Sequence, residues 1–141
     1  MGGPLKRVES DTKFDRYVST FDRHGFCRRA IEDSRHQFLG YAGVMPSPSD
    51  HPLGPHAEVG WRLARSAWGQ GYATEAAGVA LIDVFTRVGL SEVLAYTSSD
   101  NARSQAVMRR LGLRREPVRD FSHAYDNRPW DGLVWVARPV V

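Results

Sequence analysis

A change of hydrophobic period across a glycine pair constrains the fold of this chain more than any other feature. Residues 57–64 alternate between apolar and polar side chains, a pattern typical of a half-buried strand. Residues 72–88 instead carry apolar side chains at helical spacing. Gly69 and Gly71 lie between the two patterns. The chain is therefore predicted to pass from a strand into a helix through a glycine turn.

The other segments predict an α/β (α+β) fold around this junction. Helices are expected over residues 9–24 and 100–112, and strands over 26–33, 38–45, 91–99, near 118–123 and near 133–138. A proline-rich loop is expected at 46–56, and a second loop at 124–132, which is expected to be hairpin-like over 126–132. One helical face of the first helix carries Phe14, Tyr17, Val18 and Phe21. The sum predicts a single domain over residues 1–141, with helices packed on a mostly antiparallel sheet.

Composition narrows the classes of partner. The formal net charge is +3 and the arginines are spread along the chain, which favours a small anionic ligand over nucleic acid. The single cysteine, Cys27, excludes an internal disulfide and points to a cytoplasmic setting. We expect no membrane span and no signal peptide, because no apolar run is long enough. We expect no metal, because the five histidines lack ligand spacing.

The glycine turn is suited to holding a phosphate group. The start of a helix leaves backbone N–H groups unpaired and carries a partial positive charge, and glycine lets an anion approach closely. A nucleotide P-loop is excluded because no lysine follows the glycines. A dinucleotide fingerprint fits poorly because Thr74 stands where a third glycine or alanine belongs. A pyrophosphate held by backbone N–H groups and a tight turn without ligand remain as alternatives.

Two blocks of sequence carry a resemblance to a known family. The stretch EVGWRLARSAWGQGYATEA (58–76), followed by AYTSSDNARSQAVMRRLGL (95–113), resembles the GCN5-related N-acetyltransferase (GNAT) superfamily. Gly71 and Ala73 match the small residues of its acetyl-CoA loop, and Trp68 stands where Gln or Arg is usual. The second block most resembles the branch of ribosomal-protein alanine and serine N-terminal acetyltransferases, through a set of five matching residues: Asn101, Ser104, Val107, Leu111 and Gly112. The resemblance covers about residues 9–138.

The resemblance implies a co-substrate and a reaction. It implies acetyl-CoA-dependent transfer of an acetyl group to a primary amine, either a protein N-terminus or a small molecule, by direct attack on the thioester. The alternative is a non-catalytic, regulatory module that binds CoA. The residues implied in CoA binding are Trp61, Leu63, Trp68, Gly69, Gln70, Gly71, Tyr72, Ala73, Thr74, Asn101 and Ser104.

Acetyl transfer to an amine requires a base, because the amine must lose a proton to attack. Glu58 is the candidate base, with a strand carboxylate paired to arginine as the alternative. Ser104 is the candidate proton donor near the thiol, with a capping role as the alternative. Asn101 is expected either at the pantetheine arm or as a helix cap. Tyr96 faces either the core or a pocket, and the core is favoured.

The resemblance also implies that the fold lacks the family's first strand and first helix. Family members place these elements before the segment that aligns with residues 9–25, where this chain has MGGPLKRV. A strand at 26–33 would then form a bare sheet edge, which favours pairing with a second chain. We therefore expect a homodimer.

Overall fold

The computed structural model describes residues 7–140 and contains three α-helices and seven strands. The helices are α1 (Arg7–His24), α2 (Tyr72–Asp83) and α3 (Ala102–Arg110). The strands are β1 (Arg28–Glu32), β2 (Phe38–Pro46), β3 (Ala57–Leu63), β4 (Val93–Thr97), β5 (Arg114–Arg115), β6 (Phe121–Tyr125) and β7 (Arg128–Ala137). Three short helical turns are η1 (Arg65–Ala67), η2 (Val84–Val88) and η3 (Pro117–Arg119).

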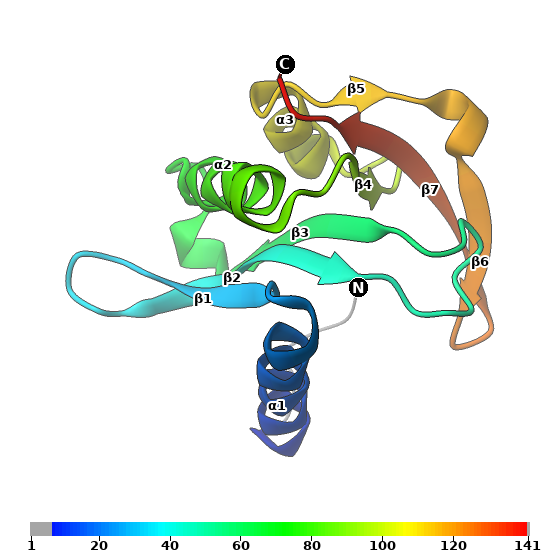
Figure 1. Ribbon diagram of the computed structural model, residues 1–141. Helices are drawn as coiled ribbons and strands as arrows, with labels where there is room; N and C mark the ends of the chain where they lie inside the picture. Colours follow the sequence, from blue (N-terminus) through cyan, green and yellow to red (C-terminus); the bar gives the residue numbers. More distant parts are fainter. Residues whose placement is uncertain (1–6, 141) are drawn as a thin grey trace.

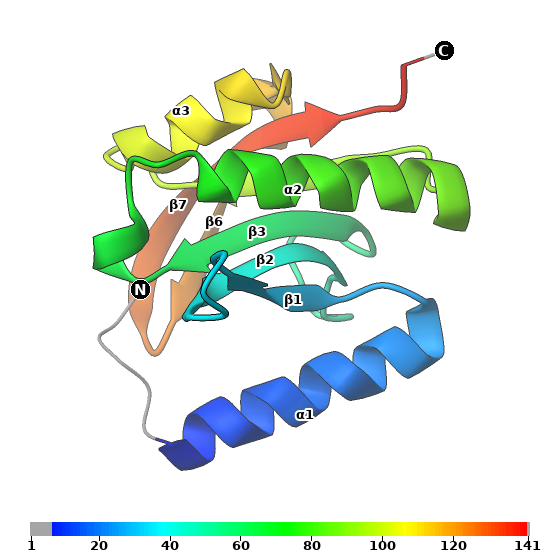
Figure 2. The same ribbon diagram turned by 90° about the vertical axis from the view of Figure 1, so that its left-hand side faces the viewer.

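The strands form one mixed sheet in the order β1-β2-β3-β4-β7-β5, and β6 pairs with β7 (Figure 1). Every pairing is antiparallel except that of β3 with β4. Helices α2 and α3 cover one face of the sheet, and α1 lies on the other (Figure 2). The predicted class, a mostly antiparallel sheet flanked by helices, is confirmed.

The core has a large part and a small part, one on each face of the sheet. The large part fills the space between the sheet and helices α2 and α3, and its fully or nearly fully buried members include Val44, Val59, Ala77, Val84, Val93, Ala95 and Met108. The small part contains Leu94, Val134 and Val136, with Leu53, Tyr96 and Phe121 packed against it. Alternation along β4 explains the division, because successive side chains point to opposite faces.

Most predicted helices and strands are present. The first helix ends at Gly25 (φ 79°), and α2 continues through η2 to Gly89 (φ 84°), as the two glycines predicted. On α1, Tyr17 is buried whereas Val18 is exposed, so the apolar stripe is narrower than expected. The side chain of Phe14 lies outside the described residues.

Two predictions for the last third of the chain had the wrong bounds. The strand expected near 118–123 is present as β6 but begins only at Phe121, because residues 118 and 119 belong to the turn η3 that Pro117 begins. The hairpin-like loop expected within 124–132 is shorter than predicted, since only Asp126 and Asn127 join β6 to β7. Both turn residues have positive φ, 50° and 61°. Asp and Asn tolerate this conformation, which two-residue hairpin turns of type I′ require.

No helix within residues 7–140 combines the length and apolar character needed to cross a membrane.

Candidate active site

The sheet opens between its two parallel strands. Within residues 7–140, β3 and β4 pair through a single register position, Glu58 with Leu94. The adjoining antiparallel pairs each extend over five or more positions. Beyond Glu58, the edge of β3 that faces β4 therefore has no strand to pair with, although it lies in the middle of the sheet (Figure 1). Its backbone groups are available to a ligand that can accept and donate hydrogen bonds.

The glycine turn follows directly from this strand and opens the backbone at the start of α2. Gly71 is the N-cap of the helix with φ 84°, and no side chain caps this end. Gly69 also has positive φ (74°), and a Cβ built on either glycine would meet no atom within 4 Å. The first helical hydrogen bond runs from the N–H of Glu75 to the carbonyl of Gly71. The N–H groups of residues 72–74 are therefore free to hold an anion.

Trp68 joins the glycine turn to the strand and to the third helix. Its indole N–H donates to the carbonyl oxygen of Leu63 at 3.1 Å. The Arg103 guanidinium lies 3.8 Å from the centre of the indole ring, and that of Arg65 lies 5.7 Å away. Because Arg103 belongs to the first turn of α3, the two blocks that carried the family resemblance meet here. The two arginines were not singled out in the sequence, since no motif marks them, and they add positive charge beside the turn.

Asn101 is the N-cap of α3, which is one of the two roles expected for it. Its side-chain oxygen accepts a hydrogen bond from the N–H of Ser104 at 3.1 Å. The Ser104 hydroxyl has no hydrogen-bond partner in the described part of the chain. Met108, one turn further along the helix, is buried in the core and offers no ionisable group.

Glu58 lies on the opposite face of the sheet, where both of its carboxylate oxygens are engaged. Arg28 donates to Oε1 at 2.8 Å and the Tyr96 hydroxyl donates to Oε2 at 2.7 Å. Tyr96 therefore faces Glu58 and not the main core. Burial, and after it the negative charge of Glu58, raises the pKa of Tyr96 well above its ordinary value. The phenol thus stays protonated and fixes the carboxylate from one side.

Two glycines lie beside Arg28, between its backbone and Glu58. Arg28, Gly43 and Gly60 occupy one register row across β1, β2 and β3. A Cβ on Gly60 would collide with the Arg28 guanidinium, and one on Gly43 would lie 2.8 Å from the Arg28 Cα. Gly60 therefore leaves the space that the guanidinium occupies, and Gly43 lets the backbones of β1 and β2 approach closely.

Histidines from the proline-rich loop complete this side of the site. His56 places Nε2 at 3.3 Å from the Tyr96 hydroxyl and Nδ1 at 2.8 Å from the carbonyl oxygen of Gly54. The His51 ring lies 4.8 Å from the His56 ring and 5.2 Å from that of Tyr96. Burial first, and then the nearby His56, lowers the pKa of His51. Sequence reasoning missed this cluster, because the histidines come from a loop with no periodic pattern.

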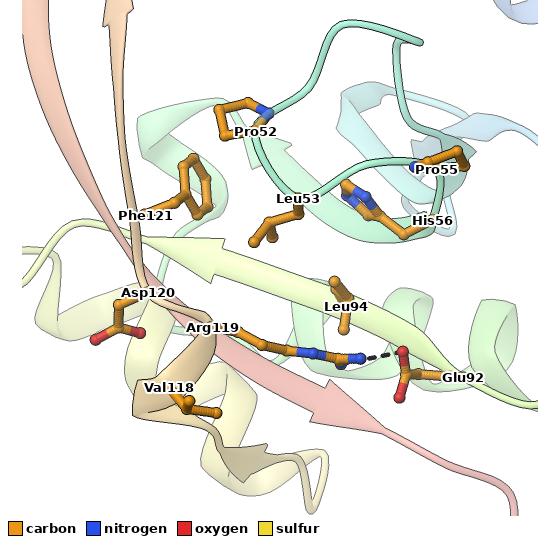
Figure 3. A pocket seen from close by; sticks show the side chains of 10 residues that line it. All are labelled: Pro52, Leu53, Pro55, His56, Glu92, Leu94, Val118, Arg119, Asp120 and Phe121. Carbon is orange, nitrogen blue, oxygen red and sulfur yellow. Dashed lines mark ion pairs between the residues drawn. The ribbon is translucent and has the colours of Figure 1, made fainter.

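A cavity of about 380 Å³ borders the cluster (Figure 3). His56 and neighbouring loop residues form one wall, and β4, η3 and the start of β6 form the others. The residues that line it are Pro52, Leu53, Pro55, His56, Glu92, Leu94, Val118, Arg119, Asp120 and Phe121. Arg119 and Glu92 form an ion pair at 3.0 Å across its floor.

The sequence-predicted site residues thus fall into two groups on the two faces of the sheet. Residues 68–74, Asn101 and Ser104 gather where the starts of α2 and α3 meet. Trp61 packs against the main core, and the carbonyl of Leu63 is occupied by the Trp68 indole. Glu58 lies on the other face, at the point where β3 and β4 last touch. Within residues 7–140, no three His, Cys, Asp or Glu side chains are grouped as metal ligands.

Comparison with known proteins identifies similar sequences. The family model described as the acetyltransferase (GNAT) domain matches residues 1–114. FsC-acetyl coenzyme A-N(2)-transacetylase of Aspergillus fumigatus is 35% identical over 97 residues, which cover 66% of this chain and 40% of that protein. An uncharacterized N-acetyltransferase of Bacillus subtilis, YnaD, is 33% identical over 80 residues, covering 56% of this chain and 47% of that protein. The matches thus span less than half the length of these curated relatives.

Solved structures show the same fold. An acetyltransferase from Agrobacterium tumefaciens superposes with a TM-score of 0.74 and 26% identity, over 98% of this chain and 75% of that one. A ribosomal-protein-S5-alanine acetyltransferase from Vibrio fischeri superposes with a TM-score of 0.76 over 97% of this chain and 77% of that one. Its identity is 17%, so this likeness concerns the fold alone.

Proposed function

Because the chain belongs to the GNAT acetyltransferase family, we propose that it transfers an acetyl group from acetyl-CoA to a primary amine. The observation that carries the proposal is the uncapped, glycine-opened start of α2, placed beside the unpaired edge of β3. One feature offers N–H groups to a pyrophosphate, and the other offers hydrogen bonds to an amide-containing arm. CoA contains both groups in sequence.

We assign the pyrophosphate to the backbone of Gln70–Thr74. Gly69 and Gly71 leave the approach to this backbone open, since a Cβ at either position would occupy empty space. Arg65 and Arg103, which flank Trp68, supply positive charge next to the same turn. Trp61 would contribute through its strand backbone, because its side chain packs against the core, whereas the Leu63 carbonyl already accepts the Trp68 indole N–H.

Glu58 is the proposed base. Acetyl-CoA supplies an activated acetyl group, and the amine must become neutral before it can attack. Arg28 and Tyr96 hold the two carboxylate oxygens in place, and each oxygen keeps a lone pair for a proton. Glu58 lies where β3 and β4 separate, which would bring it to an amine that approaches from the face opposite α2. Ser104, whose hydroxyl has no partner in the described residues, is the proposed donor on the other face.

A second candidate is a module that binds CoA without catalysis. One observation favours it: Met108 is buried and cannot donate a proton, so the helix α3 offers only Ser104 for that role. We also propose that the protein acts in the cytoplasm as a homodimer.

Release of free thiol from acetyl-CoA distinguishes the two candidates. The purified protein would be incubated with acetyl-CoA and a panel of amines: peptides with N-terminal Ala or Ser, a lysine peptide, a polyamine and an arylalkylamine. Amine-dependent thiol release, with mass spectrometry showing one added acetyl group, is expected for the enzyme. Acetyl-CoA binding by calorimetry without thiol release for any amine would support the module instead.

A further inference from the structure

The side chains of Glu58, Tyr96 and His56 form a continuous hydrogen-bonded path that begins at the Glu58 carboxylate. Tyr96 on β4 lies 2.7 Å from the Glu58 carboxylate on β3. The same hydroxyl lies 3.3 Å from Nε2 of His56, which precedes β3 in the proline-rich loop. Binding of CoA at the glycine turn requires neither of these two hydrogen bonds, so they need another explanation.

The acceptors along the path dictate where its protons lie. The carbonyl of Gly54 can only accept, so its 2.8 Å contact places a proton on Nδ1 of His56. Tyr96 has a single proton and donates it to Glu58. Its oxygen lone pair then faces Nε2 of His56, and that contact is a hydrogen bond when Nε2 carries a proton too. An imidazolium, a phenol and a carboxylate therefore satisfy every contact.

A second arrangement satisfies the same contacts with the same heavy-atom positions. In it, a protonated Glu58 donates to Tyr96, and Tyr96 donates to Nε2 of a neutral His56. Two proton hops convert this arrangement into the first. The O–H bond of Glu58 breaks as a new Oη–H bond forms, and the original Oη–H bond breaks as an Nε2–H bond forms. Tyr96 is neutral before and after, Glu58 regains its negative charge, and His56 gains a positive charge.

We propose that Tyr96 and His56 relay to solvent the proton that Glu58 takes from the amine. This inference rests on the proposed function, in which Glu58 is the base. The half-buried His56 lines the cavity of Figure 3. There one of the two N–H bonds of the imidazolium leaves its contact with Gly54 or Tyr96 and breaks as water takes the proton, and the ring becomes neutral again. The proton leaves and the carboxylate is ready for the next amine.

The groups around His56 suit a transient positive charge. Glu58 lies beyond Tyr96 and Arg28 neutralises one side of that carboxylate. His51 lies 4.8 Å from the His56 ring, and burial lowers the pKa of His51, so this neighbour stays uncharged. Across the cavity, Glu92 and Arg119 belong to an ion-pair network with Glu116 and Arg138, in which two negative and two positive charges balance.

The test compares turnover of His56→Ala, Tyr96→Phe and a control, His123→Ala, in weakly buffered solution. His123 stacks near His51 but lies outside the hydrogen-bonded path. We expect His56→Ala and Tyr96→Phe to lower kcat by about 10²-fold, the lower end of proton-transfer effects, with the KM for acetyl-CoA unchanged. Added imidazole should restore turnover of His56→Ala, because it can enter the vacated space and accept the proton. It should not restore Tyr96→Phe, and His123→Ala should turn over like the unmodified protein.

Wild-type turnover of His56→Ala at low buffer, or a loss that imidazole does not rescue, overturns the relay. Absence of thiol release by the unmodified protein would instead refute the proposed reaction. In that case, NMR of the ¹⁵N-labelled histidine rings tests whether the hydrogen-bonded path from Glu58 to His56 exists. Glu58→Gln and Tyr96→Phe should each move the His56 Nε2 resonance, whereas His123→Ala should not. If the chemical shift of His56 Nε2 is the same in both variants as in the unmodified protein, the hydrogen-bonded path does not exist.

Discussion

Two single residues in this protein serve different parts of the proposed reaction. Glu58 provides a charge where a proton must be taken up, and Gly71 lacks a side chain where a ligand must approach. Glu58 is held at both oxygens, by Arg28 at 2.8 Å and by Tyr96 at 2.7 Å. Gly71 has φ 84° and an open approach to its backbone. Each residue can be changed without touching the other, so base and cofactor turn can be tested separately.

Glu58→Gln should lower turnover by about 10²–10⁴-fold, because the amide keeps the shape of the side chain but has no proton affinity. Acetyl-CoA binding should be unchanged. The deficit should shrink as pH rises from 6 to about 9, since more of the amine is then already neutral. The rate measured as a function of pH checks this prediction, with the exposed Asp22→Asn as control. Equal rates for Glu58→Gln and the unmodified protein across this range would reduce Glu58 to an ion-pair partner of Arg28.

Gly71→Val should weaken acetyl-CoA binding, because the branched side chain would fill the approach to the helix start. Gly89 is the matched control: it has the same φ of 84°, it lies just beyond η2, which continues α2, and a Cβ there also meets nothing within 4 Å. Both variants should lose about 1–2 kcal/mol of stability from the left-handed backbone. Calorimetry should show lost affinity for Gly71→Val alone, and equal affinities would remove the turn from the binding site.

At the scale of elements, the Arg28 side chain extends from β1 across β2 to Glu58 on β3. Strands β1, β2 and β3 align Arg28, Gly43 and Gly60 in a row, and the guanidinium ends at Glu58. The two glycines differ in what a methyl group would meet. At Gly60 it would meet the movable tip of Arg28, but at Gly43 it would meet the backbone of residues 27 and 28.

Gly60→Ala should therefore fold normally and displace the Arg28 guanidinium, whereas Gly43→Ala should lose about 1–3 kcal/mol of stability from overpacking. Turnover of Gly60→Ala should fall by the same factor as that of Arg28→Gln. The double variant should be no worse than either, because both changes remove one ion pair. Additive losses would show that Gly60 acts on something other than Arg28.

The strand and helix order could be predicted because periodicity changes sharply at the glycine pair, and because Gly25, Gly89 and Gly112 stop their helices. The sequence predicted a hairpin-like loop between the last two strands but not its short two-residue turn, because Asp126 and Asn127 adopt positive φ without a glycine to mark the position. The cofactor turn carried a recognisable pattern. The path from Glu58 through Tyr96 to His56 did not, because it joins three segments through side-chain contacts that no local spacing reveals.

At the scale of the whole molecule, one flank of the sheet is open. Within residues 7–140, β1 pairs with β2 on one side and with no strand on the other. An unpaired row of backbone N–H and C=O groups is a template for another chain. Arg29 and Glu32 give this edge charges of both signs, and they lie an odd number of residues apart, so they belong to opposite faces of the strand.

Self-association should therefore raise the mass above that of the 15.8 kDa chain. Light scattering at high micromolar concentration should give a dimer. Arg29→Glu should weaken it by placing like charges along the edge. A mass of one chain at that concentration would contradict the prediction.

The single register position between β3 and β4 divides the sheet in a way that bears on its motions. One half contains β1–β3 and the other β4–β7, and each half is held together by antiparallel ladders. Such halves are natural units of cooperative opening, and the seam between them is the weakest part of the sheet. Amide hydrogens along the seam should then exchange with solvent faster than those inside either half. A ligand bound in the seam would hydrogen-bond to strand edges that otherwise have no partner there. Its release would let the two halves of the sheet separate more readily.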